Sequence, residues 1–296
     1  MRIGILTTGN EEEDNRLFEA AEERGHSAEI LFLSQCSLHV CMDAPDIYYD
    51  ERPIGDAFDI ILPRIDTPHT QYGFTILRQF QSMHVYTSDR AFVLEVGRDK
   101  MRCMQRLLKK EVPFPSTGIA YAKKDFDTMV ERVGGAPIIV KLVEGTEGIG
   151  VFLARDAKEA VYLLKTFKQL STPLIVQKFI EESSGSDIRA FVVGGKVVAS
   201  MERNSNDGDF RANIALGGHS KALTLSAEEE QVALDAVKAI GINIAGVDLI
   251  RSNKGPLVIE INVAPNFGGT WGLEDVSGVD VAGAIIEYAV SEQAKM

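Results

Sequence analysis

Short apolar segments alternate with amphipathic segments over residues 1–89, and this alternation restricts the fold more than any other feature of the chain. Residues 2–7, 28–33 and 59–63 are predicted strands, because they are apolar and too short for buried helices. Residues 14–24 carry an apolar stripe at helical spacing and end before a glycine, which predicts a helix. A repeated strand–helix pattern predicts a mostly parallel sheet covered by helices on both faces.

The rest of the chain is predicted to be richer in hairpins. A basic helix at residues 99–110 is followed by Pro113 and Pro115, which indicate a boundary. Gly194 and Gly195 separate two strand-like segments, as is typical of a two-residue hairpin turn. The fold class is therefore α/β. The predicted divisions are an N-terminal α/β domain at residues 1–89, a connecting helix at 90–115, a central lobe at 116–180 and a C-terminal lobe at 181–296.

Composition argues against several classes of protein. The formal net charge of −12 at pH 7 argues against a broad nucleic-acid-binding surface, which needs basic residues. No apolar run approaches the ~20 residues of a membrane span, and no signal-peptide pattern opens the sequence. The three cysteines form no C-x-x-C pair, which argues against a disulfide framework and a zinc site. We therefore expect a cytoplasmic protein with no membrane or direct nucleic-acid partner.

The most informative single motif is KLVEGTEGIGV, at residues 141–151. A buried strand ends at Lys141, and a loop with Gly145, Gly148 and Gly150 follows. Glycines let the backbone approach a phosphate closely, and a lysine supplies a positive charge for the same anion. The motif is neither a Walker loop nor a dinucleotide-binding fingerprint. It is interpreted as a phosphate-binding loop, and a plain β-hairpin is the alternative.

Asp248, Glu260 and Asn262 form a second candidate site. Glu260 and Asn262 are two residues apart on one predicted strand, so their side chains point to the same face. Asp248 lies on the preceding strand of the same hairpin, close enough to meet them. Two carboxylates and an amide oxygen are suitable ligands for Mg²⁺. The sequence therefore predicts a metal site, with two exposed acidic residues as the alternative.

Three further cations are ambiguous on their own. Arg203 and Arg211 flank a loop and could together bind a carboxylate or a phosphoryl group. Lys100 begins the basic helix directly after Asp99. Each of them could equally belong to a solvated surface.

Taken together, these segments resemble the RimK family of ATP-grasp ligases, and the resemblance covers nearly the whole chain. The order of the segments is also the same, which makes the resemblance more specific than any single motif. The segments that carry it are residues 63–73 (PRIDTPHTQYG), 98–105 (RDKMRCMQ), 134–151 (GGAPIIVKLVEGTEGIGV), 186–203 (SDIRAFVVGGKVVASMER), 208–213 (GDFRAN), 245–262 (AGVDLIRSNKGPLVIEIN) and 278–283 (GVDVAG).

The resemblance implies an ATP-grasp fold behind a pre-ATP-grasp domain, and it implies a role for each candidate residue. Lys100 and Lys141 would bind ATP phosphates, Lys178 and Phe179 would contact adenine through their backbone, and Asp187 would bind the ribose. The implied ATP-binding residues are Lys100, Lys141, Lys178, Phe179, Asp187, Arg211, Ala212 and Asn213. The implied catalytic residues are Arg203 and Arg211, and the implied ligands of two Mg²⁺ or Mn²⁺ ions are Asp248, Glu260 and Asn262.

The reaction that the resemblance implies has two steps. An acceptor carboxylate attacks the γ-phosphate of ATP, which gives an acyl phosphate and ADP, and the amine of L-glutamate then displaces phosphate. Catalysis of this kind depends mainly on positioning and charge neutralisation. The implied acceptor is the C-terminus of small-subunit ribosomal protein S-six, and the implied assembly is a homo-oligomer, a tetramer.

The sequence departs from the family pattern at two places. Lys178 stands where relatives carry an acidic residue, which matters little if the contact is through the backbone. After Asn262 the family reads N-x-S-P-G, whereas this chain has Ala264, Asn266 and a short insertion with Trp271. We expect residues 264–273 to form a mobile loop that controls which acceptor is used.

Three alternatives follow from this departure and from the fold itself. The first is a RimK-like ligase that uses a different small-molecule or peptide acceptor. The second is another ATP-grasp reaction, such as carboxylation. The third is a non-catalytic nucleotide-binding regulator, against which the presence of Lys141, Arg211 and the three candidate metal ligands argues.

Overall fold

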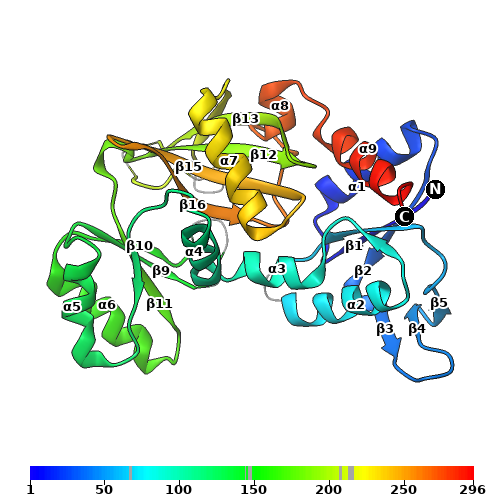
Figure 1. Cartoon of the computed structure of the whole chain (residues 1–296), viewed down its shortest axis with the longest axis horizontal. Helices are drawn as coiled ribbons and strands as arrows, with labels where there is room; N and C mark the ends of the chain where they lie inside the picture. The colour runs from blue at the N-terminus through cyan, green and yellow to red at the C-terminus, as the bar shows by residue number, and fades with distance from the viewer. Residues whose placement is uncertain (67–68, 144, 146–148, 207–208, 213–216) are drawn as a thin grey trace.

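The computed structural model describes residues 1–66, 69–143, 145, 149–206, 209–212 and 217–296. Its three larger sheets are separated along the long axis in Figure 1, with the N-terminal sheet at the right. A fourth, smaller sheet joins the N-terminal one. No helix within the described ranges is long and apolar enough to cross a membrane.

The N-terminal sheet is parallel and has the strand order β2-β1-β6-β7. The prediction of a parallel α/β sheet at this end of the chain is therefore confirmed. Its strands form because apolar side chains fill both faces, and β1 is buried along all but its first residue. The strands are β1 Arg2–Thr7, β2 Ser27–Phe32, β6 Ile60–Arg64 and β7 Tyr86–Thr87, and the neighbouring helices are α1 Glu11–Glu23, α2 Thr70–Ser82 and α9 Val281–Gln293.

A small antiparallel sheet, formed by residues that follow β2 and precede β6 in the sequence, was not predicted. It has the order β3-β4-β5, with the strands β3 Cys36–His39, β4 Asp46–Tyr49 and β5 Arg52–Pro53. These strands are two to four residues long, which is too short for an alternating pattern to distinguish them from a loop.

Helices α3 Ala91–Arg98 and α4 Lys100–Lys109 run between the N-terminal sheet and the other two large sheets (Figure 1). Asp99 separates the two helices because its side chain accepts hydrogen bonds from the backbone N–H groups of Met101 and Arg102. This cap starts α4 at Lys100. The basic helix is thus confirmed, and its first residue is turned toward the central part of the molecule.

The second large sheet is antiparallel and has the order β10-β9-β11-β8. Two helices cover it, and side chains of the helices and the sheet form a separate hydrophobic core around Phe126, Val140 and Val176. Its strands are β8 Thr117–Ile119, β9 Ile138–Leu142, β10 Val151–Ala154 and β11 Leu174–Lys178, and its helices are α5 Phe126–Arg132 and α6 Ala157–Gln169.

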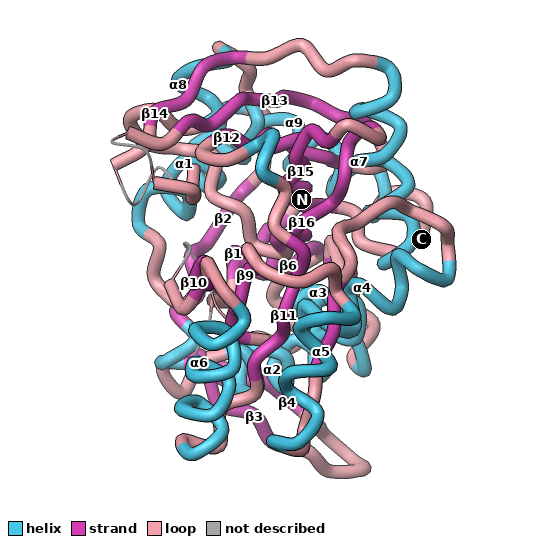
Figure 2. The backbone as a smooth tube through the Cα atoms, turned by 90° about the vertical axis from the view of Figure 1, so that its left-hand side faces the viewer, coloured by secondary structure: helices cyan, strands magenta, loops and turns pink. Residues whose placement is uncertain are grey.

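The third large sheet is antiparallel and has the order β14-β13-β12-β15-β16 (Figure 2). Helix α7 packs on it and begins with a capping box between Ser226 and Glu229. The strands are β12 Ser186–Val193, β13 Lys196–Asn204, β14 His219–Ala222, β15 Ile244–Ser252 and β16 Gly255–Asn262, and the helices are α7 Ala227–Ile240 and α8 Leu273–Ser277. Single 3₁₀ turns cover η1 Leu33–Gln35, η2 Lys123–Asp125 and η3 Glu181–Ser183.

The N-terminal and third sheets share hydrophobic cores, whereas the second sheet has its own. A buried carboxylate adds to the junction, because Asp89 accepts hydrogen bonds from the backbone N–H groups of Asn243 at 2.7 Å and Ile244 at 3.3 Å. The N-terminal domain is therefore packed firmly on the sheet that carries the predicted metal ligands.

Candidate active site

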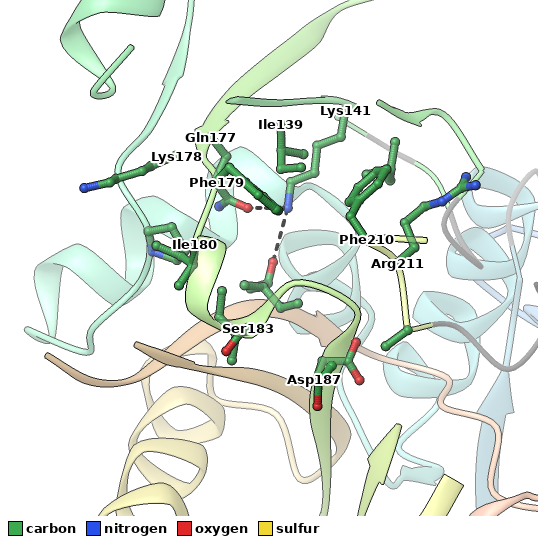
Figure 3. A pocket seen from close by; sticks show the side chains of 16 residues that line it. Ile139, Lys141, Gln177, Lys178, Phe179, Ile180, Ser183, Asp187, Phe210 and Arg211 are labelled. Carbon is green, nitrogen blue, oxygen red and sulfur yellow. Dashed lines mark hydrogen bonds between the residues drawn. The ribbon is translucent and has the colours of Figure 1, made fainter. Parts of the chain in front are cut away.

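A pocket lies between the second and third sheets, and six of the eight residues predicted to bind ATP line it (Figure 3). One side comes from β9 and β11, and the other from β12, β15 and β16. The lining residues are Pro115, Ile139, Lys141, Val151, Gln177, Lys178, Phe179, Ile180, Ser183, Ser186, Asp187, Phe210, Arg211, Ala212, Ile250 and Ile259.

Lys141 reaches into this pocket from the end of β9. Its Nζ donates to Oε1 of Gln177 at 2.9 Å and to the backbone carbonyl of Ile259 at 3.3 Å, as the dashed lines in Figure 3 show. Because Ile259 belongs to β16, this lysine connects the two sheets. Burial lowers the pKa of Lys141 to about 8. Among the described residues no carboxylate contacts this ammonium group directly, and a buried ammonium group of this kind is suited to binding an anion such as a phosphate.

Lys178 and Phe179 follow on the neighbouring strand and lie at the rim and the wall of the pocket. Figure 3 shows the Lys178 side chain pointing away from the pocket, and its stem lies beside Gly134. Phe179 faces Phe210 edge to face, with ring centroids 6.4 Å apart. Lys178 therefore offers the pocket its backbone, while the two rings supply an apolar surface suited to a flat heterocycle.

Asp187 and Asp248 are joined by Arg203, which is almost fully buried. Arg203 donates to both oxygens of Asp187, at 2.6 and 2.8 Å, and its Nη2 lies 2.9 Å from Oδ2 of Asp248. Burial alone would lower the pKa of Arg203, but the two carboxylates raise it. Burial raises the pKa of Asp187 above its usual value. The predicted ribose-binding residue, catalytic arginine and metal ligand thus form one buried ionic chain.

The three predicted metal ligands lie together on β15 and β16. Asp248 is the cross-strand partner of Glu260, and Nδ2 of Asn262 donates to Oδ2 of Asp248 at 3.2 Å. Glu260 also forms an ion pair with Lys100, at 3.0 Å. The structure therefore brings together all three residues that the sequence singled out, and adds Lys100 to them.

The donor set suits a hard divalent cation. Oδ2 of Asp248 is engaged by Arg203 and Asn262, while Oδ1 accepts only one hydrogen bond, from Nε of Arg189 at 2.9 Å, among the described contacts. An ionised carboxylate oxygen has two lone pairs, so Oδ1 can accept a further partner. Burial alone would raise the pKa of Asp248, but Arg189 and Arg203 lower it to about 2, which keeps the carboxylate ionised.

The predicted phosphate-facing residues are described in part. Arg211 and Ala212 line the pocket, and Arg211 bonds to Asp209, with Nη2 at 2.9 Å from Oδ2. Asn213 lies outside the described residues, as does Gly148 of the predicted phosphate-binding loop. In the described part of that loop, the backbone carbonyl of Gly145 accepts a hydrogen bond from Lys100 Nζ at 2.8 Å.

Two positioning residues were missed by sequence reasoning. Gln177 orients Lys141 and itself donates to Thr117 Oγ1 at 2.8 Å. Arg189 donates two hydrogen bonds of 2.9 Å to Asp248. In the sequence, each of the two is a polar residue inside an otherwise apolar strand. The partner of each could not be predicted, because it depends on the register between strands.

Residues 264–273 follow the predicted metal ligands and contact the N-terminal domain. Arg64 Nη1 donates to the carbonyl of Pro265 at 2.9 Å, and Phe267 is fully buried against Phe191 at a centroid distance of 5.9 Å. The first part of the segment is therefore packed against the N-terminal domain and β12, while mobility at Gly268 and Gly269 stays a prediction. Trp271 is 51% exposed, and its backbone carbonyl accepts a hydrogen bond from Ser220.

An apolar pocket between two antiparallel sheets, with the buried Lys141 in its wall and Lys100 and the acidic cluster beside it, is the arrangement of an ATP-grasp enzyme. Two family models match in sequence order. The RimK PreATP-grasp domain matches residues 1–92, and the RimK-like ATP-grasp domain matches residues 97–289.

Curated relatives and solved structures agree with these matches. A protein of Methanococcoides burtonii named probable alpha-L-glutamate ligase is 42% identical over 97% of this chain and 95% of its own length. Probable alpha-L-glutamate ligase 1 of Shewanella amazonensis is 44% identical, with the same coverage. The RimK domain ATP-grasp protein of Sphaerobacter thermophilus has the same fold, with a TM-score of 0.75 and 21% identity over 98% of this chain and 100% of that one.

The chain therefore belongs to the RimK-like ATP-grasp family. It is an ADP-forming ligase, and it uses ATP and Mg²⁺ as ATP-grasp ligases do.

Proposed function

We propose that this ligase adds L-glutamate to a carboxylate acceptor through an acyl phosphate. The observation that carries the proposal is the similarity to relatives named probable alpha-L-glutamate ligase, at 42–44% identity over 97% of the chain. Lys141 in the pocket is available for the phosphates, and Lys100 and the oxygens of Asp248, Glu260 and Asn262 lie beside the pocket.

In this proposal the residues have the roles implied by the family resemblance. Lys100 and Lys141 bind the ATP phosphates, Asp187 binds the ribose, and the backbone at Lys178 and Phe179 contacts adenine. The apolar wall formed by Phe179 and Phe210 supports the adenine assignment. Arg211, Ala212 and Asn213 face the phosphates.

The metal and catalytic assignments rest on the same cluster. Asp248, Glu260 and Asn262 would hold two Mg²⁺ or Mn²⁺ ions, which would neutralise negative charge on the phosphates. Arg211 would act on the transferred phosphoryl group directly. Arg203 is engaged with two carboxylates and is 3% exposed, so we propose that it orients Asp187 and Asp248 rather than contacting the substrate.

We propose the C-terminus of ribosomal protein S-six as the acceptor and a tetramer as the assembly, in line with the family resemblance. The division into residues 1–89, 90–115, 116–180 and 181–296 is part of this proposal. The alternative is a RimK-like ligase with a different peptide or small-molecule acceptor. It is favoured by one observation, the exposed Trp271 in the segment that follows Asn262 and departs from the family pattern.

The test is incubation of the enzyme with ATP, MgCl₂, a mixture of amino acids and candidate acceptors, followed by mass spectrometry. Glutamate dependence of ADP release supports the proposed donor, and a mass increase of S-six by glutamate residues supports the proposed acceptor. A mass increase on another acceptor only would establish the alternative. Release of AMP and pyrophosphate would overturn the reaction type.

A further inference from the structure

Three buried polar side-chain atoms have no hydrogen-bond partner in the part of the chain that the structure describes. They are Oδ1 of Asp14, Nε of Arg64 and Nε of Arg98. Buried polar groups are almost always hydrogen-bonded, so each exception needs an explanation. All three residues belong to the N-terminal domain or the helix that leaves it, and none of them has a role in the proposed ATP or metal site.

The three side chains form one electrostatic cluster. The positive charge of Arg64 favours the ionised form of Asp14 and so acts to lower the pKa of Asp14. The same charge also acts to lower the pKa of Arg98. Arg64 and Asp14 are 7% and 1% exposed, and the Arg98 side chain is 13% exposed. Burial and the nearby Arg64 guanidinium both lower the pKa of Arg98, and the neighbouring carboxylate of Asp66 does not fully offset them.

The cluster occupies the position where a parallel sheet binds ligands. Strand β1 is paired with β2 on one side and β6 on the other, so the connection reverses direction between β1 and β6. Open α/β sheets bind ligands outside the carboxyl ends of the strands at such a reversal. Thr7 and Arg64 are the last cross-strand pair there, and Thr7 Oγ1 donates to Asp14 Oδ2 at 2.6 Å.

This edge of the N-terminal sheet faces the predicted metal ligands. Arg64 holds the carbonyl of Pro265, three residues after Asn262, and Arg98 lies two residues before Lys100, the partner of Glu260. Glu260 also contributes to the electrostatic surroundings of Arg98. At the rim of the cluster Asp66, whose side chain is 46% exposed, lies 3.7 Å from Arg98 Nη2.

We propose that Arg64 and Arg98 bind the two carboxylates of the incoming amino acid, and that Asp14 accepts a hydrogen bond from its amino group. Two unpaired donors and one unpaired acceptor complement a zwitterion that carries two carboxylates, and arginine is well suited to binding carboxylates. The inference rests on the proposed function, since it names the residues that would select an acidic amino acid. It places the donor amino acid between the N-terminal sheet and the acidic cluster of β15 and β16.

The main variant for the test is Arg98→Gln, which removes the charge and, because glutamine is shorter, also removes the bond of Arg98 to the carbonyl of Ile65. Arg64→Lys is the second variant, because lysine keeps the charge and can still reach the carbonyl of Pro265 while losing Nε. Arg52→Gln on β5 is the matched control, since that exposed arginine pairs with Glu29 outside the cluster. The measurements are the dissociation constants of L-glutamate, L-glutamine and ADP by calorimetry in the presence of MgCl₂.

We expect Arg98→Gln to weaken L-glutamate binding about tenfold or more and to reduce the preference for L-glutamate over L-glutamine, because a charge-assisted bond is lost. ADP binding stays within about twofold of wild type in all variants, and Arg52→Gln has wild-type affinities. Unchanged L-glutamate affinity and preference in both cluster variants would overturn this inference and leave the proposed function standing. If the wild-type enzyme neither binds L-glutamate nor releases ADP in its presence, the proposed function itself is overturned, and this inference with it.

Discussion

Arg203 donates two hydrogen bonds, of 2.6 and 2.8 Å, to the carboxylate of Asp187, and both side chains are almost completely buried. The same guanidinium lies 2.9 Å from Asp248. One cation therefore compensates two buried carboxylates, to which the proposal assigns the ribose and a metal ion. Its loss would leave Asp187 without this partner and Asp248 with Arg189 alone.

Arg203→Met is accordingly expected to lower the free energy of unfolding by about 3–5 kcal/mol, since removing one partner leaves buried charge behind. Denaturant titration followed by circular dichroism measures this. Arg2→Met is the matched control, because Arg2 pairs with Asp59 at the exposed surface and its removal should change stability little. Equal stability of the two variants would show that Arg203 does not hold this cluster together.

Glu260→Ala is expected to reduce ADP release by roughly 10²–10³-fold, because the transferred phosphoryl group would lose much of its charge neutralisation. Glu260 is partly exposed, so the melting temperature should change much less than in Arg203→Met. Phosphate and ADP release are measured across a MgCl₂ titration. Near-normal turnover at ordinary Mg²⁺ concentration would contradict the metal assignment.

Lys178→Glu and Lys141→Ala should differ sharply although the two lysines lie on neighbouring strands. The Lys178 side chain points away from the pocket (Figure 3), so its reversal of charge should change ATP affinity by no more than about threefold. Lys141→Ala removes a buried cation and should weaken ATP binding by roughly tenfold or more. Calorimetric titration with ATP compares them, and a severe effect of Lys178→Glu would show that its side chain binds the nucleotide.

Asp89→Asn provides a test of the junction between the N-terminal and third sheets. Burial raises the pKa of Asp89 to about 7, far above the usual aspartate value. Between about pH 4 and 7 the folded chain therefore keeps a proton that the unfolded chain releases, so this residue's contribution to stability falls as pH rises. As pH rises across that window, the free energy of unfolding of Asp89→Asn should increase relative to wild type by up to about 1 kcal/mol per pH unit.

Urea unfolding of both proteins at several pH values checks this prediction. A relative loss of stability with rising pH would mean that the two backbone N–H donors stabilise the carboxylate more than burial destabilises it.

Trp271→Ala is expected to raise the KM of the acceptor by about fivefold or more while the KM of ATP stays within about twofold. The reason is that an exposed indole in the segment that follows the predicted metal ligands can cover an acceptor, whereas it does not line the nucleotide pocket. Steady-state kinetics with the acceptor found by mass spectrometry gives both values. A change in oligomeric state with unchanged acceptor KM would assign Trp271 to subunit packing instead.

Local sequence patterns predicted the parts of the fold that depend on local properties. The strands β1, β2 and β6 are continuous apolar runs, and α4 begins at a capping aspartate, so their positions were predicted to within a few residues. The sheet of β3, β4 and β5 was missed, because short mixed strands are stabilised by their packing rather than by a pattern of their own.

The candidate site shows the same division. Asp248, Glu260 and Asn262 could be grouped from one hairpin, since the turn sets their register. The partners of Asp248 could not, because Arg189 and Arg203 reach it through pairings between strands far apart in the sequence. The contact of Arg64 with Pro265 spans 201 residues and follows only from the packing of the N-terminal domain on the third sheet.

Lys100 and Lys141 each bond to acceptors from more than one part of the molecule: Lys100 to Gly145 and Glu260, and Lys141 to Gln177 and Ile259. If the phosphates of a nucleotide bind these ammonium groups, they replace oxygen atoms of the protein that accept the same hydrogen bonds now. The enthalpy of such an exchange is small, but the two long side chains are already restricted to productive rotamers. Nucleotide affinity should then depend on preorganisation set during folding, with only a small loss of side-chain entropy on binding.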